Sequence, residues 1–304
     1  MNHLTAHIST LMQRLNFPGE AMQAFTAVEK RLDENAAFAE KFDSLVHSYM
    51  SSENNGDDIW EKVKQVAQEF GENEYTLNEV LLLNNTEELL CRYRVRGIGE
   101  DIYWDTMDDL RCKLLECMEC EEVPGTFVPG WYNGFFKLER FAYGRFQYEM
   151  TEYNREESFT TRSGIVLKED MPLVNFHIPS SGIPLTDEVR LDSYKRAFAQ
   201  LKDAFDGGPV LFVCSSWLLY PRHREFLPAN SNILRFMDDF ELIDYEESDR
   251  FGNGWRVYGK YSDLPYAELP EKTSLQKAYK KWLCSCGKAG HGYGVIVFDG
   301  EKIL

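Results

Sequence analysis

The chain has no long apolar run. No stretch approaches the roughly 20 apolar residues of a transmembrane helix, and the first residues, MNHLTAHISTLMQRL, contain no compact apolar segment of signal-peptide type. We therefore expect a cytoplasmic protein that does not span a membrane. The cysteines number seven and are spread through the chain, so we expect reduced thiols rather than a disulfide framework.

The chain is also poor in positive charge. It carries 50 acidic and 33 basic residues, a net charge of −17, and no basic cluster dominates. A duplex-binding protein needs a basic face that displaces counterions, so the composition argues against a nucleic-acid partner. Residues 1–120 account for −12 of this charge and the remainder for −5. The second part would repel a polyanionic ligand less than the first.

Two familiar kinds of catalytic or metal site are missing. Cys284-Ser285-Cys286 and His291 offer three ligands, but their spacing is not a zinc pattern, and we predict no metal. The G-x-S-x-G elbow of α/β-hydrolases is absent. Cys214-Ser215-Ser216 follows a buried strand, where a nucleophile would need His177 or His223 as its base. The alternative is a small buried thiol beside two hydroxyls that bond local backbone.

The composition, 43% hydrophobic and 27% charged, is typical of a globular protein, and the length suggests two domains. Residues 1–122 read as a helical domain, with apolar residues at helical spacing in 59–70, 77–90 and 99–119. The pattern changes at Val123-Pro124-Gly125, where aromatic residues and turn signals become frequent. We therefore place a second domain at 123–304.

The second domain mixes strands and helices. The clearest helix is 187–205, capped by Thr186 or Asp187 and followed by the buried strand 210–213. A hairpin loop at 249–254 is predicted to join two strands, and Gly290, Gly292 and Gly294 to make a turn before the last one. The expected strands are 135–141, 145–153, 163–168, 173–178, 241–246, 255–261 and 294–298, and the other helices are 232–240 and 273–283.

The order of elements between residues 138 and 261 resembles the core of the GNAT acyltransferases. Three segments carry a closer resemblance to a GNAT-like family of two-domain bacterial proteins: HIPSSGIPLTDEVRLDSYKRAF (177–198), VLFVCSSWLLYP (210–221) and GHGYGVIVFDG (290–300). The resemblance implies an α+β protein, with a helical N-terminal domain followed by a GNAT-like mixed-sheet acyltransferase domain. It also implies acyl-CoA, with acetyl-CoA as the expected co-substrate, placed between the strands at 173–178 and 210–213.

The phosphate-binding loop departs from the family pattern. GNAT enzymes use Q/R-x-x-G-x-G/A before a helix, whereas residues 179–186 read PSSGIPLT, and Pro184 has no N–H to offer. The position between strand and helix suits an anion, so Ser180, Ser181, Gly182 and Thr186 are our candidate cofactor-binding residues. Cys214 and Ser216 would contact the pantetheine arm. A plain connection stabilised by its serines is the alternative.

The residue at the position of the general acid also differs from the family pattern. Many GNAT enzymes place a tyrosine in the helix before the closing strands, but this helix offers Phe236 and Phe240. Tyr220 lies nearby in sequence and is our candidate acid. His177, at a strand end, is the candidate base, with a satisfied structural histidine as the alternative. Ser215 completes the predicted catalytic residues.

The leading hypothesis is transfer of an acyl group from acyl-CoA to an unidentified small-molecule acceptor, with an amine expected. The alternative from another class is a GNAT-like ligand-binding or interaction protein without catalysis, which the imperfect loop and missing tyrosine favour. A hydrolase using Cys214 or Ser216 is a third hypothesis. A homodimer is an arrangement that the sequence leaves open.

Overall fold

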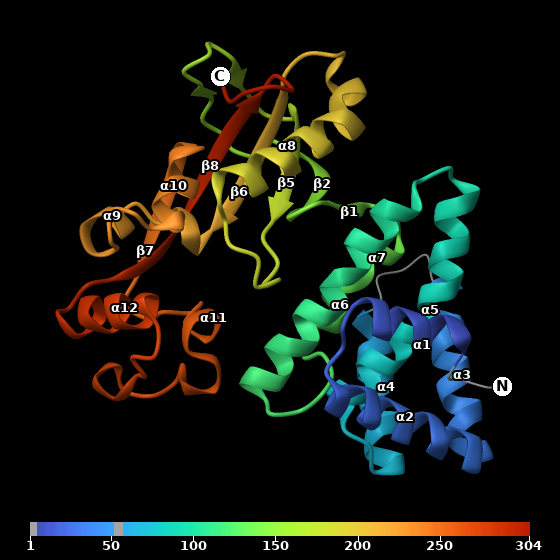
Figure 1. The fold of residues 1–304 in the computed structure, drawn as a ribbon. Coiled ribbons are helices and arrows are strands. Elements are labelled where there is room, and N and C mark those ends of the chain that lie inside the picture. The colour runs from blue at the N-terminus through green and yellow to red at the C-terminus, as the bar shows by residue number, and fades with distance from the viewer. Residues whose placement is uncertain (1–4, 52–56) are drawn as a thin grey trace. The chain divides into compact units, whose positions relative to one another are not determined.

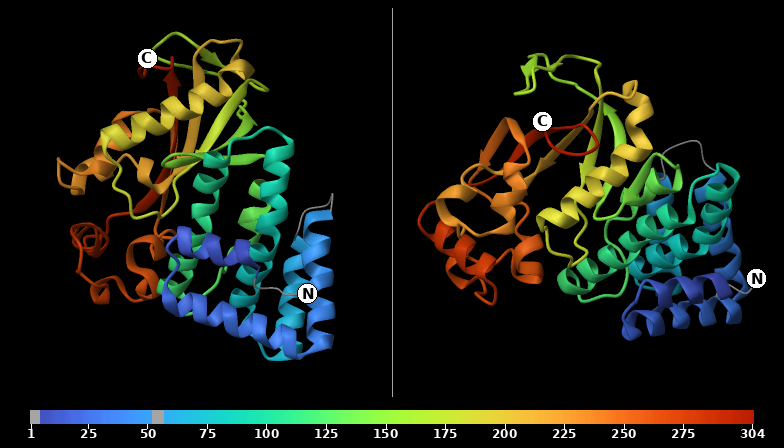
Figure 2. Two further views of the ribbon diagram at one scale, coloured as in Figure 1. Left: turned by 45° about the vertical axis from the view of Figure 1, so that its right-hand side comes forward. Right: turned by 45° about the horizontal axis from the view of Figure 1, so that its top comes forward.

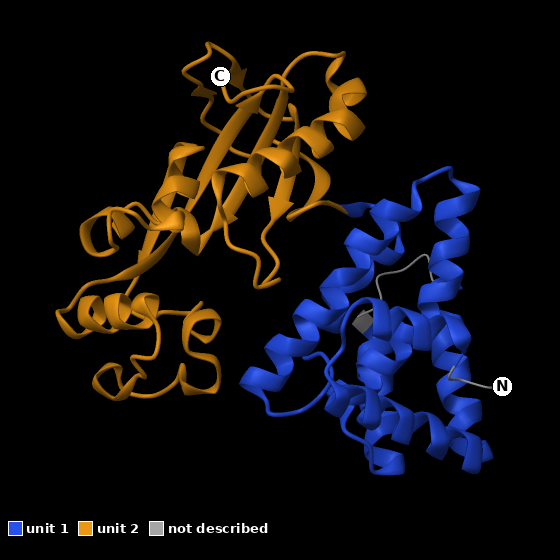
Figure 3. Cartoon of the chain, in the orientation of Figure 1, with its two compact units in different colours: residues 1–141 blue, residues 142–304 orange. Residues whose placement is uncertain are grey.

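The computed structural model describes residues 5–51 and 57–304 and divides into two compact units, Met1–Phe141 and Ala142–Leu304 (Figure 3). The division falls later in the chain than the boundary expected at 122/123, because residues 129–136 are helical. Each unit is described by itself below. None of the helices in the described ranges is long and apolar enough to cross a membrane.

The first unit is a bundle of helices (Figure 1). The three predicted helices are present as α4, α5 and α6, and Gly71 ends α4 in a left-handed conformation with φ +68°. The core consists of the apolar stripes of these helices, including Val63, Leu81 and Leu110. Its elements are α1 (Ala6–Arg14), α2 (Gly19–Glu34), α3 (Ala36–Ser51), α4 (Asp57–Phe70), α5 (Glu74–Val95), α6 (Glu100–Cys120), η1 (Pro129–Tyr132) and α7 (Asn133–Phe136).

One predicted strand is wrong in this part of the chain. Residues 135–141 were expected to form a strand, but Asn133–Phe136 is the short helix α7, and the strand β1 occupies Arg140–Tyr143. Phe135 and Phe136 are buried, and Phe136 lies against Tyr49 of α3 with ring centroids 5.2 Å apart. Burial of these rings in the helical core outweighs their preference for strands.

The second unit is built on a six-stranded sheet in the order β1-β2-β5-β6-β8-β7 (Figures 1 and 2). β5 and β6 are parallel, while β2–β5, β6–β8 and β7–β8 are antiparallel. A separate hairpin pairs β3 with β4, so residues 163–168 do not continue the main sheet as expected. The strands are β2 (Phe146–Glu152), β3 (Phe159–Thr160), β4 (Val166–Leu167), β5 (Pro172–His177), β6 (Val210–Ser216), β7 (Glu241–Ser248) and β8 (Ala289–Phe298).

The helices of this unit include the three that were predicted, α8, α10 and α12. Thr186 caps α8, as expected, and Asp206 in a left-handed conformation follows its last 3-10 turn. The helical elements are α8 (Asp187–Leu201), η2 (Lys202–Phe205), η3 (Trp217–Leu219), α9 (His223–Phe226), α10 (Asn232–Asp238), α11 (Trp255–Tyr258), η4 (Gly259–Tyr261), η5 (Tyr266–Glu268) and α12 (Ser274–Cys284).

The sheet has one face covered by helices. Tyr194 of α8 packs against Phe146, Phe176 and Phe212, and Phe240, just after α10, stacks on Phe176. We call this side the helix-covered face. Because side chains alternate along strands, the opposite face carries Leu173, Leu211, Val213, Val295 and Val297, which form a second core with Tyr153 and Leu167.

The segment between β7 and β8 differs from the predicted hairpin. Trp255–Tyr258 is helical rather than a strand, and β7 pairs with β8 instead. The predicted turn at the glycines is also wrong, because Gly290, Gly292 and Gly294 lie within β8. A Cβ on Gly292 would come within 2.4 Å of the Leu219 carbonyl oxygen, so these glycines let the chain after β6 approach the strand.

Candidate functional site

The parallel strands β5 and β6 part before they end. Their register consists of Val174↔Phe212 and Asn175↔Val213, yet β5 continues to His177 and β6 to Ser216. Beyond this point the facing edges of the two strands do not form a ladder. The paired register thus ends before the carboxyl ends of the two strands between which we expect the ligand.

Alternation places two predicted catalytic residues on one face of the sheet. His177 follows Asn175 by two positions and Ser215 follows Val213 by two, so both point toward the opposite face of the sheet. His177 is partly buried and the Ser215 side chain is exposed. The structure therefore places His177 and Ser215 on the same face of the sheet, near the carboxyl ends of β5 and β6.

Glu149 is the partner of His177. The carboxylate Oε1 of Glu149 lies 2.7 Å from His177 Nε2, and Asn175 Nδ2 lies 3.1 Å from the same oxygen. Because an ionised carboxylate only accepts hydrogen bonds, the favoured tautomer carries its proton on Nε2, and Nδ1 is then the basic nitrogen. The side chains of His177 and Glu149 retain 24% and 23% of their accessibility, so the pair is within reach of a ligand.

Tyr293 of β8 stands directly opposite Ser215 on the other side of β6. Its partner on β7 is Asp244, which a β-bulge shifts onto the same face as Ile243. Arg155 joins these side chains, with its guanidinium 4.5 Å from the Tyr293 ring centroid and Nη1 2.8 Å from Asp244 Oδ2. Burial raises the pKa of Tyr293, so its phenol stays protonated and can donate.

A cavity of about 430 Å³ adjoins these groups. Its walls come from the chain after β2 and from the bulged part of β7, and they include Arg155, Glu156, Glu157 and Asp244. The opposite face therefore changes along its strands from an apolar core to a polar surface next to a cavity. This change occurs at the level where β5 and β6 part.

The predicted phosphate loop is exposed at the start of α8. Ser180, Gly182 and Thr186 are exposed, Gly182 has φ +78°, and a Cβ there would meet nothing within 4 Å. Ser181 Oγ accepts a hydrogen bond from the Ile183 N–H at 3.3 Å, and Thr186 Oγ1 accepts one from the Val189 N–H at 3.5 Å. Both hydroxyls thus stabilise local backbone in this structure.

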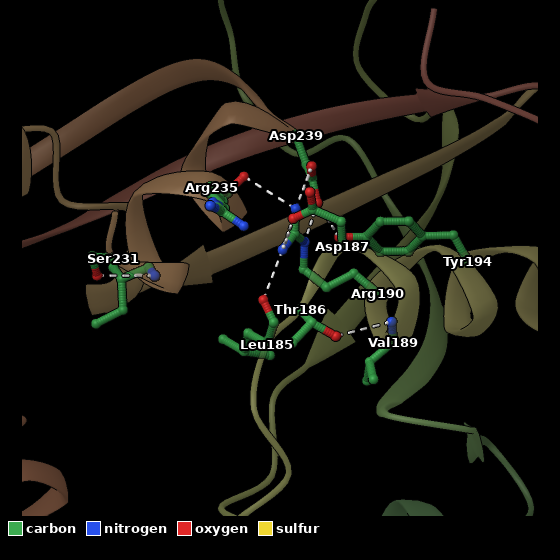
Figure 4. A network of polar contacts seen from close by, with 10 residues as sticks. Leu185, Thr186, Asp187, Val189, Arg190, Tyr194, Ser231, Arg235 and Asp239 are labelled. Carbon is green, nitrogen blue, oxygen red and sulfur yellow. Dashed lines mark hydrogen bonds and ion pairs between the residues drawn. The ribbon is translucent and has the colours of Figure 1, made fainter. Parts of the chain in front are cut away.

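Two arginines hold the loop in place. Arg145 donates to the carbonyl oxygens of Pro179 and Ile183, at 2.8 and 3.2 Å. Arg190, only 3% exposed, donates to the Leu185 carbonyl at 2.7 Å and to both carboxylate oxygens of Asp239 (Figure 4). The loop is therefore fixed at both ends by guanidinium groups.

The buried Arg190 also connects two helices. Figure 4 shows it reaching from α8 to Asp239 at the end of α10, where Tyr194 donates to the same carboxylate at 3.0 Å. Burial lowers the pKa of Arg190, but the hydrogen bonds and charge of Asp239 outweigh it and raise the pKa overall. This pair sets the distance between the helices that follow β5 and precede β7.

The remaining predicted residues lie on the helix-covered face. Cys214 is 2% exposed, and burial strongly raises the pKa of its thiol, which opposes thiolate formation. Ser216 Oγ accepts from the Leu218 N–H at 3.2 Å. Tyr220 is fully buried, donates to Glu247 Oε1 at 3.1 Å and lies beside Gly290. The structure does not bring these three together with His177 and Ser215.

The sequence interpretation missed Glu149 and Tyr293. A signal existed in the alternation of β2, where Tyr148 is buried and Glu149 is not, but the partner of Glu149 follows only from the register Glu149↔Asn175. In the C-terminal cysteine region, Cys284 and Cys286 are exposed. Among the residues that the structure describes, no group of three or more His, Cys, Asp or Glu side chains is placed to hold a metal ion.

Two family models match the chain. Residues 6–138 match an N-acyltransferase N-terminal domain, and residues 141–296 match a GNAT-like C-terminal domain. The predicted resemblance and the predicted fold class are thereby confirmed. None of the curated protein sequences matches the chain.

Solved structures of acyltransferases share the fold. A variant acyltransferase in complex with octanoyl-CoA has 18% identity and a TM-score of 0.72, over 97% of this chain and 88% of that one. An acyltransferase in complex with decanoyl-CoA and teicoplanin has 19% identity and a TM-score of 0.71, over 95% and 87%. One in complex with decanoyl-CoA alone has 19% identity and a TM-score of 0.62, over 96% and 99%. At these identities the likeness shows the fold alone.

Proposed function

Because the chain belongs to the N-acyltransferase family with a GNAT-like C-terminal domain, we propose that it transfers an acyl group from acyl-CoA to an amine of a small-molecule acceptor. The observation that carries the proposal is the Glu149–His177 pair beside the point where β5 and β6 part. The pantetheine arm, an amide chain, would lie along the strand edges that have no ladder there. Its thioester would then face the polar side of the sheet.

The reaction needs no covalent enzyme intermediate. The acceptor nitrogen attacks the thioester carbonyl, and His177 Nδ1 removes the proton from that nitrogen, while Glu149 stabilises the imidazolium through Nε2–H. Ser215 donates a hydrogen bond to the tetrahedral oxyanion. The C–S bond then breaks, and the thiolate of CoA takes the proton of the Tyr293 phenol, which the proton held by His177 restores through solvent.

Tyr220 is not the acid in this proposal. It lies on the helix-covered face, is fully buried and already donates to Glu247. Its role is to fix the chain after β6 against β7. Ser180, Ser181, Gly182 and Thr186 remain the proposed contacts of the diphosphate, which would require the hydroxyls to exchange their backbone partners.

The acyl chain and the acceptor are open to experiment. Acetyl-CoA was expected from the family, but the structural neighbours were solved with octanoyl- and decanoyl-CoA, so the donor panel should run from acetyl to decanoyl. The acidic walls of the cavity favour an acceptor that carries positive charge. A cytoplasmic location and a homodimer remain predictions.

The test is turnover by the full chain with each acyl-CoA and a panel of primary amines, with mass spectrometry to detect the acylated amine. Replacement of His177 by Ala should lower kcat about 100-fold or more if it is the base. His47→Ala, at an exposed position on α3, is the control and should keep activity. Binding of CoA without any transfer would instead support the non-catalytic alternative.

A further inference from the structure

The insertion between β7 and β8 is basic in an acidic protein. Residues 249–288 contain eight Lys or Arg and four Asp or Glu, a net charge of +4, whereas the whole chain has −17. Most of the basic side chains in this insertion are exposed. A positive field of this kind is the usual signature of an anionic ligand or partner.

The insertion has its own small core and a fixed place on the unit. Phe251, Tyr258, Tyr279 and Leu283 form this core with neighbouring apolar residues. Trp282 of α12 stacks on Phe226 of α9 at 4.8 Å, so the insertion packs on the chain that leaves the carboxyl end of β6. All three views place α11 and α12 at the end of the sheet from which the loop 178–186 also extends (Figures 1 and 2).

Four lysines form two pairs on its surface. Lys260 Nζ and Lys272 Nζ lie 5.5 and 5.9 Å from the ring centroid of Tyr261, whose side chain is 40% exposed. Lys277 and Lys281 stand one turn apart on the exposed side of α12, opposite the buried Tyr279. An exposed aromatic ring with two ammonium groups close to it suits a ligand that combines a heteroaromatic base with phosphate.

The loop 178–186 is poorly equipped for phosphates. Pro184 lacks an N–H, and Arg145 already donates hydrogen bonds to the carbonyl oxygens of Pro179 and Ile183. The first turn of α8 carries Asp187 and Glu188, whose negative charges oppose an anion at this helix start. CoA brings a diphosphate and a 3′-phosphate. The residues proposed to contact the diphosphate in this loop carry no positive charge, so the 3′-phosphate needs cations elsewhere in the unit.

We propose that the insertion 249–288 binds the adenosine 3′-phosphate end of acyl-CoA, with Lys260 and Lys272 holding the 3′-phosphate beside the Tyr261 ring and Lys277 and Lys281 adding to the positive field. The proposal rests on the proposed function, because it assigns the donor of that reaction. It explains why a chain of net charge −17 can take up a polyanion. The lysines contact neither the thioester nor the acceptor, so they act on affinity and not on the chemical step.

Two double variants, K260Q/K272Q and K277Q/K281Q, test this assignment. The control K168Q/K302Q removes the same charge from exposed lysines outside the insertion. Titration calorimetry with CoA, 3′-dephospho-CoA and pantetheine measures the three affinities. We expect K260Q/K272Q to raise the Kd of CoA about tenfold, because two exposed charge interactions with the ligand are lost together. The Kd of pantetheine should not change, and that of dephospho-CoA should change less than that of CoA.

The outcomes separate this inference from the proposed function. If the wild-type chain binds CoA through these lysines but transfers no acyl group, the acyltransferase proposal fails and the assignment of the insertion stands. If transfer occurs and both insertion variants keep the wild-type Kd for CoA, the assignment alone fails. An equal loss for pantetheine would also overturn it, since that loss would come from the fold. Added salt should weaken CoA binding to the wild type more than to K260Q/K272Q.

Discussion

Arg190 and Asp239 form a two-point ion pair between α8 and the end of α10, with Nε 2.6 Å from Oδ2 and Nη2 3.0 Å from Oδ1. Arg190 is 3% exposed, so the pair sits where water screens it little. The same guanidinium holds the Leu185 carbonyl, which ends the loop before α8. A contact deep in the unit thus sets the shape of the candidate ligand loop.

Loss of one partner of this pair should be costly. Arg190→Met leaves the Asp239 carboxylate without its cation, and we expect the free energy of unfolding to fall by about 3 kcal/mol. Urea unfolding of the full chain measures the change. The double variant Arg190→Met/Asp239→Leu should recover part of the loss, because it leaves no buried charge unpaired. Strictly additive losses would contradict the pairing.

Glu149 should act through His177. Glu149→Gln removes the carboxylate that accepts from Nε2 and stabilises the imidazolium, so we expect kcat to fall about tenfold or more while KM for acyl-CoA stays near its wild-type value. Steady-state kinetics separates the two constants.

Two further variants, a control and a double substitution, test whether Glu149 acts through His177. Glu152→Gln, at the exposed end of β2, is the matched control and should retain activity. If the two residues work as a unit, His177→Ala and Glu149→Gln combined should be little worse than His177→Ala alone. A double variant whose losses multiply would show that Glu149 acts independently of His177.

The elements that sequence reasoning predicted well have local signals. α8 has an apolar stripe and a threonine cap, and β6 is a short apolar run buried on both faces. The strand predicted at 255–261 was wrong because aromatic residues favour strands in general. Here Trp255–Tyr258 is helical, and Val257 and Tyr258 join the core around Tyr279. The role of Glu149 was missed because it depends on tertiary structure and not on a local signal. Glu149 meets His177 only because β2 pairs with β5, which is distant in sequence.

Gly292 should not tolerate a side chain. A Cβ there would lie 2.4 Å from the Leu219 carbonyl oxygen, so η3 would have to move away from β8, and we expect Gly292→Ala to cost about 2 kcal/mol. Thermal unfolding reports this as a lower Tm. Gly252→Ala is the control, since a Cβ there meets nothing within 4 Å, and its effect should stay within about 0.5 kcal/mol. Equal effects of the two substitutions would refute the close approach.

Glu79 gives the helical unit a pH-dependent stability. It is fully buried on α5, and neither carboxyl oxygen has a hydrogen-bond partner among the described residues. Burial, followed by the negative charge of Asp109, raises its pKa well above the usual value, so the folded chain keeps the carboxyl protonated where the unfolded chain ionises.

The sign of the effect follows from proton binding. Above the unfolded pKa of 4.5, the folded state holds one more proton, so stability falls as pH rises, by about 1.4 kcal/mol per pH unit, until the raised pKa is reached. Glu79→Gln keeps a neutral side chain at every pH and should remove this slope. Urea unfolding at pH 5, 6, 7 and 8 compares it with wild type and with Glu119→Gln, an exposed position on α6. A wild-type slope that survives in Glu79→Gln would assign the effect to another group.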